Sequence, residues 1–167
     1  FHYFSYFSSN KKEVDGRYDV AEILNEYKDR GYSLALTEAG LLPFYSEWRC
    51  LDSWGLNDHQ IALDGVIRGS YLADFKPDMI MYDAYFEDGI VNTNPVWEGY
   101  GEMIDSLQAF VEKEDFELIA KYTSPLLDHA HYYYINPRLP DAKEIKDKIR
   151  ASTYHWYEIG TVVEAEY

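Results

Sequence analysis

The sequence predicts an α/β fold: a single three-layer domain over residues 1–167, with a mainly parallel sheet and a mixed or antiparallel edge. Three observations lead to this prediction. Helical and strand-like segments alternate along most of the chain, which is typical of α/β proteins. Two strand-like segments near the end are joined by a short loop with Pro125, which predicts an antiparallel pair at the sheet edge. A length of 167 residues suits one domain.

The first half of the chain supplies the parallel strands. Apolar residues spaced three and four apart predict a helix over residues 15–30, and Gly31 is its expected end. Strands are predicted at residues 32–37, 49–54 and 78–83. Residues 38–45 leave the first strand, and a helix capped by Asn57 or Asp58 follows the second.

The second half of the chain is expected to add the remaining strands of the sheet and further helices that pack on it. An exposed loop is predicted at 84–95, helices at 96–114 and 141–150, and strands at 116–122 and 132–136. Two terminal segments are also strand candidates, the aromatic run at 1–7 and the tail at 154–167. The chain starts at Phe1, and the aromatic run is equally consistent with a stub that follows an upstream membrane span.

Composition excludes several classes of function. The formal net charge is −15 and no basic block is present, which argues against binding to nucleic acid, because phosphate neutralisation needs clustered Lys and Arg. No apolar run reaches the roughly 20 residues that a membrane helix needs. Cys50 is the only cysteine; we expect a buried structural thiol there, without a disulfide or a thiolate metal cluster.

Sequence motifs do not assign a catalytic residue or a cofactor. The patterns GxGxxG, GxxxxGK[ST] and GxSxG do not occur, so dinucleotide, P-loop and serine-hydrolase functions have no motif support. Asp128, His129 and His131 are the weak metal candidates, because the two histidines would share one face of a strand. The alternative places them in a polar loop, and we expect no metal.

Candidate binding residues follow the predicted strands of the first half. Ligands of open α/β sheets bind outside the carboxyl ends of the strands. Acidic, amide and aromatic side chains at that edge suit sugar hydroxyls or a cationic group. The predicted binding set is Glu38, Tyr45, Ser46, Trp48, Asp52, Asn57 and Asp58. The structural alternative makes Asp58 a helix cap, Asp52 an acceptor for loop amides and Trp54 a core residue.

The segment TEAGLLPFYSEWRCLDSWGLNDHQIA, residues 37–62, resembles a pattern in the C-terminal soluble domains of polytopic GT-C-type membrane glycosyltransferases. This group includes proteins similar to dolichyl-phosphate-mannose-protein mannosyltransferases and to arabinofuranosyltransferases. The resemblance extends over residues 34–82, about a third of the chain. The matching positions are Glu38, Ala39, Gly40, Pro43, Tyr45, Ser46, Asp52, Gly55, Leu56, Asn57, Asp58, Ile61, Ala62 and the Lys76-Pro77-Asp78 strand entry.

The resemblance implies a non-catalytic accessory domain cut from a longer protein of the cell membrane. The domain would lie on the extracytoplasmic side, its partner would be the membrane portion of the same chain, and it would bind or position a glycan acceptor. In such transferases the catalytic acid lies in the membrane part, so the resemblance transfers no catalytic residue to this chain.

Two other functions stay open at the level of sequence. The first is a free-standing α/β enzyme that uses Glu38, Asp52 or Asp58 for acid–base chemistry. The second is a protein interaction module whose tyrosine-rich strands contact another subunit.

Overall fold

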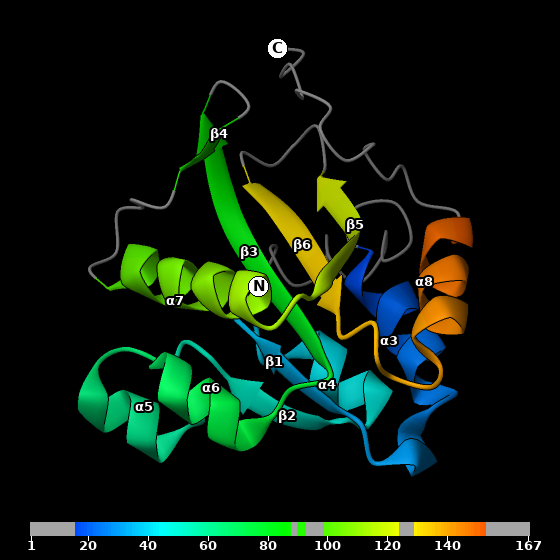
Figure 1. The fold of residues 1–167 in the computed structure, drawn as a ribbon, viewed down its shortest axis with the longest axis horizontal. Helices are drawn as coiled ribbons and strands as arrows, with labels where there is room; N and C mark the ends of the chain where they lie inside the picture. The colour runs from blue at the N-terminus through cyan, green and yellow to red at the C-terminus, as the bar shows by residue number, and fades with distance from the viewer. Residues whose placement is uncertain (1–15, 88–89, 93–98, 124–128, 153–167) are drawn as a thin grey trace, which may run out of the picture.

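The computed structural model describes residues 16–87, 90–92, 99–123 and 129–152, which form an α/β domain around one six-stranded sheet (Figure 1). The strand order is β2-β1-β3-β6-β5, and β4 pairs with β3 outside this path. The strands are β1 Ser33–Leu36, β2 Arg49–Asp52, β3 Met79–Glu87, β4 Ile90–Asn92, β5 Glu117–Thr123 and β6 His129–Ile135. The predicted fold class is therefore confirmed.

Helices cover both faces of the sheet. The helices are α3 Arg17–Asn25, α4 Leu41–Ser46, α5 His59–Asp64, α6 Gly69–Phe75, α7 Tyr100–Lys113 and α8 Ala142–Ala151, with a 3₁₀ turn η1 at Lys28–Arg30. Buried residues of α3, α4 and α8 share one core cluster, and those of α5, α6 and α7 share the other. These two cores and the sheet between them give the three layers.

Strand direction changes twice along the strand order, between β3 and β6 and between β6 and β5. Strands β2, β1 and β3 are parallel, with Leu36 opposite both Asp52 and Met81. Strand β6 runs antiparallel to β3, and β5 runs antiparallel to β6. The predicted antiparallel pair at the sheet edge is thus confirmed.

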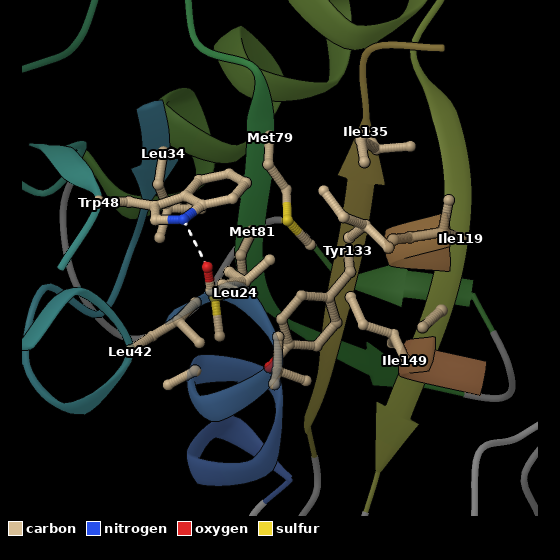
Figure 2. Close-up of a cluster of buried hydrophobic side chains, with 14 of the residues drawn as sticks. Leu24, Leu34, Leu42, Trp48, Met79, Met81, Ile119, Tyr133, Ile135 and Ile149 are labelled. Atoms are coloured by element: carbon tan, nitrogen blue, oxygen red, sulfur yellow. Dashed lines mark hydrogen bonds between the residues drawn. The ribbon is translucent and has the colours of Figure 1, made fainter. Parts of the chain in front are cut away.

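Alternation along the strands separates the two cores, because successive side chains of a strand point to opposite faces. Leu34 and Leu36 of β1 pack under α3 together with Met79 and Met81 of β3, whereas Ala35 belongs to the opposite core. Figure 2 shows the α3 side, where side chains of β1, β3, β5 and β6 lie in one cluster with Leu24 of the helix.

Several predicted elements needed correction. The loop predicted at 84–95 is wrong in part, because β3 continues to Glu87 and pairs with β4 in an antiparallel hairpin. The sequence Asp-Gly at 88–89 is a hairpin signal. The helix predicted over 15–30 ends at Asn25, before η1, and sequence analysis missed α6.

The polar-loop alternative for the histidines is also wrong, since β6 begins at His129. The strand candidates at 1–7 and 154–167 lie outside the described residues, as does Asp128. Within the described part of the chain, no helix combines the length and the apolar character needed to cross a membrane.

Trp48 joins the end of α3 to the sheet core. Its indole Nε1 donates a hydrogen bond of 2.8 Å to the carbonyl oxygen of Leu24 (Figure 2). The same carbonyl accepts from the Tyr27 amide at 2.9 Å, so the indole is a second donor to a carbonyl in the final turn of α3. Its ring also packs edge-on against Tyr32, with centroids 5.3 Å apart.

We expect Trp48→Phe to lower the free energy of unfolding by about 2–4 kcal/mol, because the buried indole hydrogen bond to Leu24 is lost and a smaller ring leaves a gap. Urea denaturation measures the change. Trp54→Phe is the matched control, since Trp54 is half-buried and packs mainly against Tyr100. Equal losses in the two variants would show that the hydrogen bond to Leu24 contributes nothing.

Candidate functional site

Three titratable side chains lie just beyond the apolar residues with which β1, β3 and β6 face α3. Glu38 lies two positions after Leu36, Asp83 lies two positions after Met81, and His131 lies two positions before Tyr133. The β3–β6 register places Asp83 directly opposite His131. The period of two therefore brings a glutamate, an aspartate and a histidine together where the apolar rows stop.

These three side chains form what we call the carboxylate–histidine cluster: Glu38, Asp83 and His131. The Nε2 atom of His131 lies 3.4 Å from Oε2 of Glu38 and 3.9 Å from Oδ1 of Asp83. One oxygen or nitrogen from each residue lies within 4.8 Å of the other two. Asp83 and His131 are buried, whereas the Glu38 side chain is 34% exposed. The cluster is thus closed on the sheet side and reachable at Glu38.

Arg17 in the first turn of α3 supplies a positive charge beside the cluster. Its Nη1 donates to Oε2 of Glu38, the same oxygen that faces His131. Buried or half-buried carboxylates are costly without such compensation. The arginine therefore offsets part of the negative charge that the two acids bring together.

The backbone at Asp83 is held from both sides. Its amide donates to the hydroxyl oxygen of Thr37 at 2.9 Å, and its carbonyl accepts from the hydroxyl of Tyr100 at 2.5 Å. The first contact links β3 to the end of β1, and the second links it to α7. These bonds fix the position of Asp83 in the sheet.

Asp52 and Asp58, two of the predicted binding residues, organise the loop after β2. The Asp52 carboxylate accepts from the backbone amides of Trp54, Gly55 and Asn57 and from the Asn57 side-chain amide. Asp58 caps α5 by accepting from the Ile61 amide at 2.9 Å, and it also accepts from the hydroxyl of Tyr71. The structural alternative stated for both acids is confirmed.

The other predicted binding residues lie in separate places. Ser46 and Trp48 are buried, and Trp48 is part of the α3-side core. Tyr45 is 38% exposed and packs edge-on against Tyr18. Among the seven predicted residues, Glu38 alone belongs to the carboxylate–histidine cluster.

Sequence reasoning missed Asp83 and Arg17 and gave His131 other partners. It grouped His131 with Asp128 and His129, whereas the structure places His131 beside Glu38 and Asp83. The missed signal is the alternation itself: each of three strand segments has a polar residue two positions beyond an apolar one on the same face.

Two further observations bear on chemistry. Burial, with a smaller contribution from the charge of Asp52, raises the pKa of the Cys50 thiol to about 12, so Cys50 is a poor nucleophile at neutral pH. A shallow pocket of about 540 Å³ is lined by Pro140, Asp141 and residues of α8. None of the predicted acids lines that pocket.

Comparison with known proteins gives one family. A family model described as a domain of unknown function (DUF8728) matches residues 6–157, which is most of the chain. The chain matches no curated protein and no solved structure.

The loop after β2 depends on glycine at position 55. Gly55 has φ +84°, and a Cβ atom there would lie 2.8 Å from Cγ2 of Ile61 and 3.1 Å from the Ala62 amide nitrogen. Gly65, at the end of α5, has φ +77°, but a Cβ atom there would meet no atom within 4 Å. The two glycines therefore share a backbone requirement and differ in the space around them.

We expect Gly65→Ala to cost about 1–2 kcal/mol from the left-handed backbone alone. Gly55→Ala should cost about 1–3 kcal/mol more, because the added methyl group overpacks Ile61. Thermal or urea unfolding of both variants measures this difference. Equal costs would mean that the loop shifts freely and that Asp52 does not fix its path.

Proposed function

We propose that the chain, which belongs to the family described as a domain of unknown function (DUF8728), is a non-catalytic accessory domain of a membrane glycosyltransferase-like protein. In this proposal the domain lies on the extracytoplasmic side of the cell membrane. It contacts the membrane portion of its own chain and binds or positions a glycan acceptor. The resemblance of residues 34–82 to such domains motivates the proposal, and two features of the structure and the charge of the chain support it.

The first feature is that the ends of two neighbouring strands bring the resembling residues together. Leu36 pairs with Asp52 across β1 and β2, and the Ser53 amide donates to the Leu36 carbonyl at 2.8 Å. Because β1 and β2 are parallel, the turn at Glu38 and the loop built on Asp52 leave the same edge of the sheet. Ligands of open α/β sheets bind at this edge.

The observation that carries the proposal is the position of the exposed apolar side chains. Among the described residues, the large hydrophobic side chains that are exposed are Phe44, Tyr45, Leu56 and Leu63, with Phe44 75% and Leu56 81% exposed. All four lie within residues 44–63, inside or next to the resembling segment. Phe44 and Tyr45 lie in α4, Leu56 lies in the loop after β2 and Leu63 lies in α5. These exposed apolar side chains are therefore candidates for contact with another protein surface.

The charge of the chain bears on which surface that is. With 30 acidic and 15 basic residues, the domain is repelled by anionic lipid headgroups. A protein surface, such as the membrane portion of the same chain, therefore suits the exposed apolar side chains better than a lipid surface does.

The alternative functions receive less support. The enzyme hypothesis used Glu38, Asp52 and Asp58, but the carboxylates of Asp52 and Asp58 are engaged by the loop and the α5 cap. The interaction-module hypothesis used tyrosine-rich strands. However, Tyr132 and Tyr133 are buried, and Tyr82 stacks between Tyr132 and Tyr134 with centroids 5.1 and 5.6 Å away.

We expect Phe44→Ser and Leu56→Ser to change the free energy of unfolding of the domain by no more than about 0.5 kcal/mol, because both side chains are exposed. In the full-length protein, the same variants should weaken docking of the domain, measured by cross-linking to the membrane portion or by protease protection. Gln60→Ser, an exposed polar change in α5, is the control. A full-length gene without several upstream apolar spans would refute the proposal.

Glycan binding is tested separately by NMR. Titration of the ¹⁵N-labelled chain with cell-envelope oligosaccharides should shift the backbone amide signals of Gly40, Gly55 and Asn57, which lie in the loops at the carboxyl edge. The amide of Lys143 in α8 serves as an internal control. Unmoved signals in the loops would remove the sugar site from the proposal and leave a scaffold role.

A further inference from the structure

We propose that Glu38, Asp83 and His131 bind one divalent cation of the first transition row, with Zn²⁺ as the preferred ion. This inference concerns the cluster under α3 and does not depend on the proposed accessory function. It rests on the spacing of the three ligand atoms, on their chemistry and on the way the fold holds them.

The spacing suits an ion of this size. Zn²⁺ binds imidazole nitrogen and carboxylate oxygen at about 2.0–2.2 Å, so two ligands of a tetrahedral site lie about 3.4 Å apart. In the cluster, Nε2 of His131 is 3.4 Å from Oε2 of Glu38 and 3.9 Å from Oδ1 of Asp83. Small side-chain adjustments therefore bring all three atoms to bonding distance of one ion.

The donor set selects the class of metal. One imidazole and two carboxylates suit Zn²⁺, Mn²⁺ or Fe²⁺, whereas Mg²⁺ and Ca²⁺ prefer oxygen ligands alone. Among the divalent ions available, Zn²⁺ binds mixed nitrogen and oxygen sites more tightly than Mn²⁺ or Fe²⁺ does. Three protein ligands also leave a coordination position for water or another ligand.

The fold positions two ligands rigidly and one adaptably. Asp83 and His131 are opposite residues of β3 and β6, and the bonds from Thr37 and Tyr100 fix the backbone of Asp83. Glu38 follows β1 in a turn and is 34% exposed, so it is the ligand that can adjust and the side from which an ion enters. Arg17, bound to Glu38, acts as the outer partner that ligating carboxylates usually have.

A competing explanation is a purely structural ion-pair cluster, in which Arg17 and His131 offset the two acids without any metal. The two explanations differ in what they predict for metal titration. A structural cluster gives no saturable binding of a transition metal, whereas a metal site gives one equivalent that depends on all three ligands.

The test titrates the chelator-treated 167-residue chain with Co²⁺, a visible-absorbing substitute for Zn²⁺. We expect one equivalent of Co²⁺ to produce d–d absorption bands, Zn²⁺ to abolish them by displacement, and a large excess of Mg²⁺ to leave them unchanged. Absence of saturable Co²⁺ bands, or bands that Mg²⁺ abolishes, would overturn the proposal.

Variants assign the ligands. Asp83→Asn and His131→Gln should weaken Co²⁺ binding by more than about 100-fold, since loss of a ligand should exceed the roughly 10–100-fold effect of losing an outer partner. Asp105→Asn removes the same charge as Asp83→Asn but at an exposed position in α7, and this control should bind Co²⁺ like the parent chain. Circular dichroism checks that each variant folds. Parent-like binding by either folded ligand variant would overturn the proposal.

If the variants at the buried Asp83 and His131 do not fold, Glu38→Gln tests the metal site instead. Glu38 is partly exposed, so its replacement should disturb folding less. A folded Glu38→Gln chain with Co²⁺ binding reduced at least tenfold supports the site. Binding equal to that of the parent chain overturns it.

Discussion

The two-residue alternation of side chains along β1, β3 and β6 is the constraint on which the rest of this structure depends. It sends Leu36, Met81 and Tyr133 into the core under α3. It then places the next residue of the same face, which is polar in each strand, at the end of that core. A shift of one residue in the β3–β6 register would turn His131 to the opposite face of the sheet from Asp83. The same strand register therefore determines both the packing of the core and the assembly of the cluster.

The edge of the sheet at the carboxyl ends of β1, β2 and β3 has two parts, which form in different ways. The outer part is built by local hydrogen bonds: Asp52 holds its loop and Asp58 begins α5. It leaves Phe44 and Leu56 exposed to solvent. The inner part is the carboxylate–histidine cluster between the sheet and α3. It forms only when β1, β3 and β6 are paired, because its three residues come from or follow different strands. The domain therefore exposes apolar side chains near this edge, whereas Asp83 and His131 are buried.

The sequence was sufficient for features that depend on near neighbours and on periodicity. The α/β class, the antiparallel edge and the roles of Asp52 and Asp58 follow from helix stripes, strand patterns and capping rules. The cluster was not predictable in the same way, because Glu38, Asp83 and His131 are far apart in the chain and meet only through strand order and register. His131 was a candidate, but its partners were sought nearby in sequence at Asp128 and His129, whereas they come from β3 and from the residues that follow β1.

Strand β2 lies at the end of the described strand order, so one of its backbone edges has no neighbouring strand there. Open edges are templates for pairing between molecules and hence for aggregation. The strand is only four residues long, begins with the exposed Arg49 and ends at Asp52. The Arg49 guanidinium lies 4.2 Å from the Phe75 ring centroid and donates to the Phe75 carbonyl. A short strand and a charge fixed beside it are features by which natural edge strands disfavour pairing with an identical strand.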